Sequence, residues 1–192
     1  MTADLVVIGG SWGGFEAVCE LLAPMPRAAA LPFVVALHRS PRSKDGALEQ
    51  MLANCLRLEV IAVEDKSPLK AGCVHVAPAD YHLLIEDGSL ALSTDPQVQF
   101  SRPSIDMLFE SAADEYMAGV VGVVLTGANA DGAAGVRRIK VLGGVTMAQE
   151  PATAVKPQMP QAAINTGCVD FVGPIPALAR ELGLLIGCEL AS

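Results

Sequence analysis

The stretch 5–14, LVVIGGSWGG, places a strand, a tight turn and the start of a helix in immediate succession. Residues 5–9 form a short apolar run rich in β-branched side chains, which is typical of a strand buried on both faces. Apolar residues then recur at helical spacing, at Phe15, Val18, Leu21 and Leu22. Between strand and helix stands Ser11, and residues 9–13 fit G-x-S-x-G, the pattern of a turn that exposes a serine hydroxyl above a sheet edge. The segment therefore predicts a nucleophilic serine.

The same glycine-rich turn has two other interpretations. Turns of this kind also bind phosphates in dinucleotide-binding folds, but here Ser11 occupies the middle glycine of G-x-G-x-x-G. No Asp or Glu ends the second predicted strand, where a ribose-binding carboxylate is expected. A purely structural turn that carries a serine by chance is the second alternative, and the motif alone does not exclude it.

The composition limits the classes of function. The 192 residues are 52% hydrophobic and carry a net charge of −8, so we expect a globular protein for which nucleic acid is an unfavourable partner. No apolar run reaches the roughly 18 residues of a membrane helix, and the N-terminus does not resemble a secretion signal. The five cysteines are widely spaced and share no ligand spacing with the histidines, so we expect reduced thiols in a cytoplasmic protein, without disulfides, metal or cofactor.

Predicted strands and helices alternate along the chain. Strands are expected at 5–9, 33–37, 58–63, 74–77, 81–85, 90–92, 120–125, 145–148 and 169–172, and helices from 15, at 47–56, within 101–117, and at 133–142, 161–165 and 175–186. The runs around Asp87-Gly88 indicate a small antiparallel hairpin. The rest predicts one α/β domain over residues 1–192, with a doubly wound, mainly parallel sheet and helices on both faces.

Three chemically complementary residues follow the ends of predicted strands. Ser11 follows the first strand, His38 the second, and Asp131 the strand at 120–125. Because parallel strands end at one edge of a sheet, these side chains should meet there as nucleophile, base and orienting carboxylate. Taken singly, His38 could be a packing residue and Asp131 the N-cap of the next helix. The order Ser, His, Asp excludes an α/β-hydrolase, in which the histidine comes last.

The same residues make the sequence resemble the catalytic domain of chemotaxis protein-glutamate methylesterases. Five ordered segments carry the resemblance: 8–14 (IGGSWGG) with His38, 72–82 (GCVHVAPADYH), 102–113 (RPSIDMLFESAA), 125–135 (LTGANADGAAG) and 159–163 (MPQAA). It implies that Ser11 is the nucleophile, His38 the general base and Asp131 its orienting carboxylate. It also implies that the backbone at Trp12 and Gly13 holds the oxyanion, and that Arg102 and Ala128 lie at the substrate cleft.

The sequence departs from the family pattern around the expected cleft. Trp12 stands where a small residue or threonine is usual, Ala128 replaces a methionine, and Arg39 follows His38 in place of a methionine. Members of the family commonly carry an N-terminal receiver domain, whereas this sequence begins at the catalytic strand. We therefore expect the catalytic domain alone, either as a free-standing member or as one domain separated from a longer chain.

Two functions remain open at this point. The first is a serine esterase that hydrolyses glutamate methyl esters on the cytoplasmic helices of chemoreceptor-like proteins, with glutamine deamidation as a related activity that the resemblance implies. The second is a non-catalytic binding module of the same fold that uses the turn at 9–14 for an anionic ligand or a protein partner, with Trp12 as an anchor.

Overall fold

A parallel sheet of seven strands forms the centre of the molecule. The computed structural model describes residues 3–27, 29–44, 46–188 and 190. The strand order is β10-β9-β8-β1-β2-β5-β3, and every neighbouring pair is parallel. The strands are β1 Leu5–Gly10, β2 Phe33–Leu37, β3 Glu59–Ala62, β5 Cys73–Val76, β8 Val120–Val124, β9 Val145–Gln149 and β10 Phe171–Gly173.

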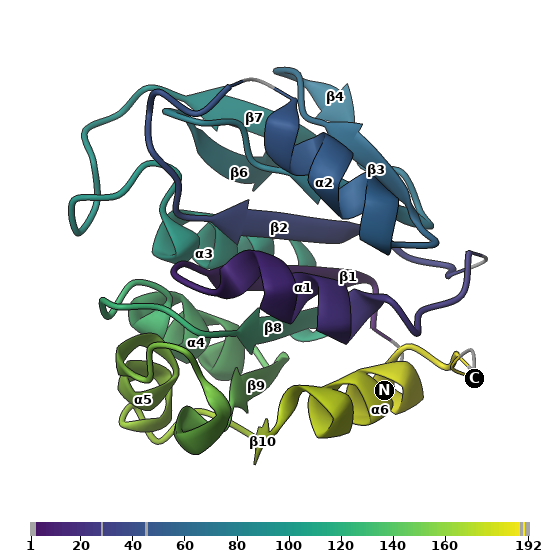
Figure 1. The fold of residues 1–192 in the computed structure, drawn as a ribbon, viewed down its shortest axis with the longest axis vertical. Helices are drawn as coiled ribbons and strands as arrows, with labels where there is room; N and C mark the ends of the chain where they lie inside the picture. Colours follow the sequence, from purple (N-terminus) through teal and green to yellow (C-terminus); the bar gives the residue numbers. More distant parts are fainter. Residues whose placement is uncertain (1–2, 28, 45, 189, 191–192) are drawn as a thin grey trace.

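Helices cover both faces of this sheet (Figure 1). One face carries α1 Gly14–Leu22, α2 Ala47–Cys55 and α6 Ile175–Leu185, and the other carries α3 Ile105–Tyr116, α4 Ala133–Val141 and α5 Gln158–Ile164. Two 3₁₀ turns, η1 Met117–Gly119 and η2 Pro151–Thr153, complete the helical segments. The expected doubly wound α/β architecture is confirmed.

A second, antiparallel sheet lies beside α3. Its order is β4-β7-β6, with β4 Ser67–Pro68, β6 His82–Glu86 and β7 Ser89–Ser93. The hairpin between β6 and β7 turns at Asp87 and Gly88, both with positive φ, as a two-residue hairpin turn requires. The predicted hairpin is therefore confirmed, whereas β4 is too short to have left a pattern in the sequence.

The apolar residues form one layer on each face of the sheet. Alternate side chains along β1 contribute to the two layers: Val6 and Ile8 pack with α1 and α6, and Leu5 and Val7 pack with α3 and α4. All six residues of β1 are buried, because the strand has neighbours on both sides and helices above and below. This explains why the segment reads as a continuous apolar run.

Two predicted elements shift by two residues or more in the structure, whereas the other bounds agree to within one residue. The helix expected at 161–165 begins at Gln158, because Pro160 lies in its first turn, where the missing N–H has no partner within the helix. The last strand, expected at 169–172, spans Phe171–Gly173, because Asp170 instead directs its side chain to Thr146. The contact of Asp170 with Thr146 joins residues far apart in the chain, so local sequence patterns do not reveal it.

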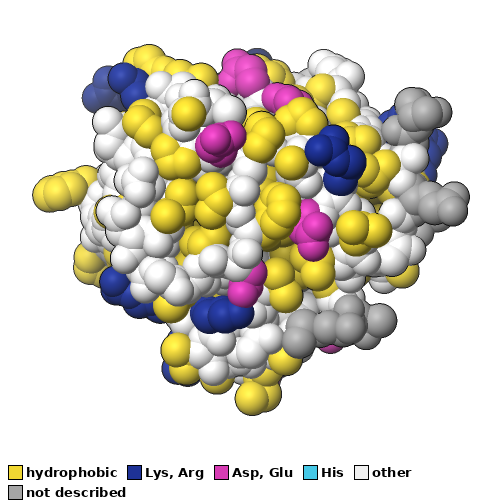
Figure 2. Space-filling model, turned by 90° about the horizontal axis from the view of Figure 1, so that it is seen from below, with side chains coloured by type: hydrophobic (Ala, Val, Ile, Leu, Met, Phe, Trp, Pro, Cys, Tyr) yellow, Lys and Arg dark blue, Asp and Glu magenta, His cyan; other side chains and the backbone are white. Residues whose placement is uncertain are grey.

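The β10 side of the molecule presents a mixed surface. From this side, hydrophobic side chains lie among acidic and basic ones (Figure 2). Val172 of β10 and Leu184 of α6 are both exposed. None of the helices in the described ranges is long and apolar enough to cross a membrane.

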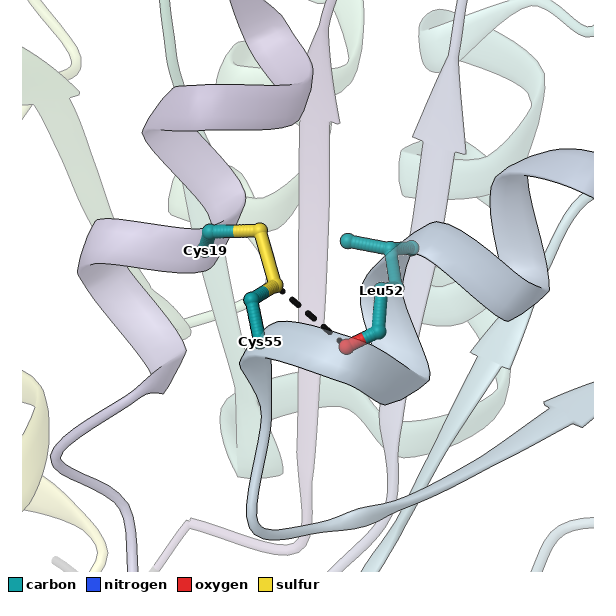
Figure 3. The surroundings of a disulfide bond; sticks show 3 residues. All are labelled: Cys19, Leu52 and Cys55. Carbon is teal, nitrogen blue, oxygen red and sulfur yellow. Dashed lines mark hydrogen bonds between the residues drawn. A yellow bond between two sulfur atoms is a disulfide. The ribbon is translucent and has the colours of Figure 1, made fainter.

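The expectation that all cysteines are reduced is wrong for two of them. Cys19 of α1 and Cys55 of α2 form a disulfide, with their Cα atoms 5.9 Å apart (Figure 3). They are separated by 36 positions in the sequence and meet only because β1 and β2 are adjacent and their following helices lie on the same face. Cys73, Cys168 and Cys188 are free thiols.

We expect the disulfide to stabilise the fold measurably. Closing a loop of this length restricts the unfolded chain and adds about 2–4 kcal/mol to the free energy of unfolding. Urea denaturation should show that loss when dithiothreitol is added. The double variant Cys19→Ser/Cys55→Ser should be insensitive to the reductant, and a wild-type curve unmoved by reduction would contradict the prediction.

Candidate active site

The candidate site lies where the central strands end. The sheet order reverses at β1, which has β2 on one side and β8 on the other, and crevices at such reversals bind ligands in open α/β sheets. Ser11 follows β1, His38 follows β2, and Asp131 lies in the loop between β8 and α4. The structure therefore brings the three strand-end residues to one edge.

Backbone hydrogen bonds hold the turn that carries Ser11. The Ser11 N–H donates to Thr126 O at 2.8 Å, and the Gly14 N–H donates to Ser11 O at 2.8 Å. Gly13 has a φ of 80°, a conformation that glycine adopts without strain, and it is the N-cap of α1. Within the described chain, the N–H groups of Trp12 and Gly13 have no hydrogen-bond acceptor. Both donors are thus available to an oxyanion.

His38 and Asp131 form a buried pair. Their Nε2 and Oδ2 atoms are 2.7 Å apart, and the Asp131 side chain is completely buried. Further donors are arranged around the carboxylate: Ser104 Oγ at 2.9 Å, Ile105 N at 2.8 Å, Asp106 N at 2.9 Å and Gly132 N at 3.1 Å. Burial acts to raise the pKa of Asp131, but the bonds from His38, Asp106 and Ile105 outweigh it and hold that pKa below its usual range.

An ionised Asp131 determines which tautomer His38 adopts. A carboxylate can only accept, so Nε2 of His38 carries the proton and donates it to Asp131. Nδ1 is then the basic nitrogen of the ring. In the described structure its neighbour is Ser101 Oγ at 3.2 Å, and Ser11 Oγ makes no hydrogen bond to it.

Asp131 and Asp106 cap each other's helices. Asp131 accepts N–H groups at the start of α3, and Asp106 Oδ1 accepts from Gly132 N at 2.8 Å and Gly135 N at 2.9 Å at the start of α4. The interpretation of Asp131 as only an N-cap of the helix after it is therefore wrong, because its carboxylate accepts hydrogen bonds mainly from the first N–H groups of α3. The contact of Asp106 with α4 is not among the expectations drawn from the sequence. The place of Asp106 in the 102–113 motif was the available signal.

Asp106 is the member of this pair whose pKa is raised. Burial, together with repulsion from Asp131, raises the pKa of Asp106 to about 6 despite the N–H groups of Gly135 and Gly132. The pKa of Asp106 in the folded state lies above its unfolded value of 3.8. The protonated carboxyl therefore adds to the free energy of unfolding below about pH 4, and this contribution is lost as the pH rises through 6.

We expect Asp106→Asn to remove this pH dependence. A pKa raised from 3.8 to about 6 corresponds to roughly 3 kcal/mol, so the wild-type free energy of unfolding should fall by up to that amount between pH 4 and pH 7 relative to the variant. Urea denaturation across this range measures it. Asp87→Asn, at an exposed hairpin residue, is the matched control. Parallel pH curves for wild type and Asp106→Asn would contradict the prediction.

A cleft opens over the pair. Its volume is about 510 Å³, and it is lined by Ser11, His38, Arg39, Ser40, Pro41, Gln97, Gln99, Phe100, Ser101, Arg102, Ala128 and Asn129. A smaller, more apolar cavity of about 250 Å³ adjoins it between α1 and α2 and shares Ser11, His38 and Arg39. Ser11 thus faces a polar space on one side and an apolar one on the other.

The other expected site residues differ in their surroundings. Arg102 lines the cleft, but its guanidinium donates to Asp80 Oδ1 at 2.7 Å and to the carbonyls of Thr94 and Asp95. Ala128 also lines the cleft, while Trp12 is 67% exposed with Lys156 Nζ 5.8 Å from its ring centroid. Arg39 is largely buried and pairs with Glu49, so it fixes the wall of the cleft more than it extends into it.

In the part of the chain that the structure describes, no three His, Cys, Asp or Glu side chains are grouped as a metal site requires. The groups around Ser11 include its own hydroxyl, the imidazole of His38 with its buried carboxylate partner, and the unpaired N–H donors of Trp12 and Gly13. Such an arrangement can activate a hydroxyl for attack on a carbonyl carbon and stabilise the resulting oxyanion.

Comparison with known proteins gives the family. A family model described as CheB methylesterase matches residues 6–182. The chain belongs to the CheB methylesterase family. The fold agrees: the structure resembles the crystal structure of the Thermotoga maritima CheB methylesterase catalytic domain with a TM-score of 0.90 and 30% identity, covering 96% of this chain and 100% of that one.

Two relatives differ in their length relative to this CheB methylesterase chain. One from Leptospira interrogans, named as a putative protein-glutamate methylesterase/protein-glutamine glutaminase, is 41% identical over 94% of this chain and 93% of its own length. One from Anaeromyxobacter dehalogenans, named as protein-glutamate methylesterase/protein-glutamine glutaminase 2, is 40% identical over 93% of this chain. The chain spans about half of the second relative, 52% of its length.

Proposed function

We propose that this protein is a serine esterase that hydrolyses methyl esters of glutamate side chains on the cytoplasmic helices of chemoreceptor-like proteins. The same site would deamidate glutamine, because an amide passes through an equivalent tetrahedral species. The observation that carries the proposal is the 2.7 Å contact between His38 and the buried Asp131 at the edge where Ser11 follows β1. Membership of the CheB methylesterase family supports the choice of substrate.

The residues have distinct roles in this reaction. Ser11 Oγ attacks the ester carbonyl carbon while Nδ1 of His38 takes its proton, and Asp131 holds the imidazolium that forms. The N–H groups of Trp12 and Gly13 bind the oxyanion. As the tetrahedral species collapses, Nδ1 protonates the departing methoxide and methanol leaves. Water, deprotonated by His38, then attacks the acyl-enzyme, and His38 returns that proton to Ser11 Oγ as the glutamate side chain is released.

The shape of the cleft fits a side chain projecting from a helix. A volume of about 510 Å³ takes one extended glutamyl ester but no helix, so the substrate backbone must stay at the rim. Phe100, which lines this cleft, is 97% exposed, and Trp12 beside Ser11 is 67% exposed. Exposed aromatic side chains are favoured contacts in protein interfaces, so these two are the residues we assign to docking of the helix.

The test is methanol release from methyl-esterified cytoplasmic fragments of a chemoreceptor, compared with unmethylated fragments. Wild-type protein should release methanol in proportion to the esters present, and Ser11→Ala should lose nearly all of this activity. Absence of release and of labelling of Ser11 by a serine-reactive phosphonate, with the protein shown to be folded, would overturn the esterase and favour the binding module.

A further inference from the structure

Ser101 makes a contact with His38 to which the proposed reaction assigns no role. Its Oγ lies 3.2 Å from Nδ1 of His38, on the ring nitrogen opposite the one bound by Asp131. We propose that Ser101 is a positioning residue, whose hydroxyl holds the basic nitrogen of His38 toward the cleft and yields it to Ser11 during the reaction. This inference rests on the proposed role of His38 as the base.

The hydrogen-bond direction follows from the tautomer. With the proton on Nε2 and Asp131 ionised, Nδ1 has a lone pair only, so Ser101 must donate. The imidazole is then held at both nitrogens. If Asp131 alone held the imidazole, the ring could rotate about that one hydrogen bond and carry Nδ1 away from Ser11. A hydroxyl suits the second position because it can accept as well as donate once Nδ1 is protonated.

The segment that carries Ser101 is built to hold it in place. Val98 and Ser101 exchange both backbone hydrogen bonds, at 3.2 and 2.9 Å, across a tight turn. The two central residues, Gln99 and Phe100, have φ values of 48° and 62°, a left-handed conformation that is unfavourable for residues other than glycine. Strain of this kind persists only where the surroundings enforce it.

A side-chain contact ties this turn to the rest of the site. Gln99 Nε2 donates to Asp106 Oδ2 at 3.0 Å, and the N–H of Asp106 donates in turn to Asp131. The turn is thus joined through α3 to the carboxylate that holds the other side of His38. The two contacts to the ring are therefore set by one connected group of side chains.

The experiment compares Ser101→Ala with Ser101→Thr, which keeps a hydroxyl. We expect Ser101→Ala to lower kcat for methanol release about 10-fold with KM nearly unchanged, the scale of one hydrogen bond. Ser101→Thr should restore most of the rate. An effect confined to KM, or an equal loss in both variants, would overturn the proposal.

A spectroscopic measurement separates positioning from a general structural effect. In protein labelled with ¹⁵N-histidine, with His38 assigned through His38→Gln, the Nδ1 resonance of His38 should move in Ser101→Ala and stay in place in Ser101→Thr. The Nε2 resonance should remain that of a nitrogen bonded to Asp131 in both. An Nδ1 resonance that is unchanged in Ser101→Ala would overturn the proposal without bearing on the esterase activity.

The phosphonate adduct distinguishes a positioning residue from a second nucleophile. Mass spectrometry of the labelled wild-type protein should place the adduct on Ser11, and Ser101→Ala should still be labelled, only more slowly. An adduct on Ser101 would overturn its positioning role, and would also reassign the nucleophile. If wild-type protein is neither labelled nor active, the proposed function fails, while the resonance of Nδ1 still decides whether Ser101 holds His38.

Discussion

Ser11→Ala is expected to abolish methanol release, with a loss of at least about 10⁴-fold in kcat. Without Oγ there is no acyl-enzyme, and the reaction must use water directly attacking the ester. The N–H groups of Trp12 and Gly13, to which we assign the oxyanion, belong to the backbone and remain in place, so some residual acceleration over water should persist. The loss is so large because nucleophile and base act as one unit.

The fold should not change in this variant. The Ser11 backbone, and not its side chain, makes the bonds to Thr126 and Gly14, and Oγ has no hydrogen bond in the described structure. Methanol assays under single-turnover conditions, with circular dichroism of the same samples, measure both properties. Ser89→Ala, in β7 and outside the cleft, is the matched control. Full activity of a folded Ser11→Ala would remove Ser11 from the reaction.

Asp131→Asn is expected to reduce kcat by about 10⁴-fold while the protein still folds. The amide can direct its NH₂ group at Nε2 of His38, which then accepts a hydrogen bond instead of donating one. The ring proton moves to Nδ1, and the nitrogen that must take the proton of Ser11 is occupied. The change is one of tautomer, and it leaves the position of the ring nearly intact.

The stability cost of Asp131→Asn should be modest. Its remaining oxygen still accepts from Ser104 and from the N–H groups of Asp106 and Gly132, whereas the N–H of Ile105 loses its acceptor. One unsatisfied buried donor costs about 1–3 kcal/mol. Asp114→Asn, which breaks an exposed pair with Arg138, controls for removal of a charge. A folded Asp131→Asn that keeps wild-type kcat would exclude the orienting role.

The main features of the fold follow from local pattern. The continuous apolar runs of β1, β2 and β8 identified central strands, since a strand covered on both faces has no polar side to show. The Asp87-Gly88 turn identified the hairpin, because these residues tolerate positive φ. Ser11, His38 and Asp131 were placed on one edge by topology alone, because parallel strands all end on the same side.

The remaining features depend on contacts between segments far apart in the chain. No spacing rule pairs Cys19 with Cys55, since their approach depends on how α1 and α2 pack over the sheet. Asp131 caps α3 and Asp106 caps α4 only because the N-termini of the two helices lie side by side. A short stretch of sequence carries no information about this arrangement. The raised pKa of Asp106 follows from this packing.

The sequence by itself therefore determined the α/β architecture, the family resemblance and the three residues at the edge of the sheet, because hydrophobic periodicity is a local property and parallel strands all end on the same edge. Only the tertiary structure decided which nitrogen of His38 faces Asp131, that Ser101 holds the other, and that Asp106 shares the burial of Asp131. These features depend on the distances and angles between side chains, and a hydrogen bond forms only within a narrow range of both.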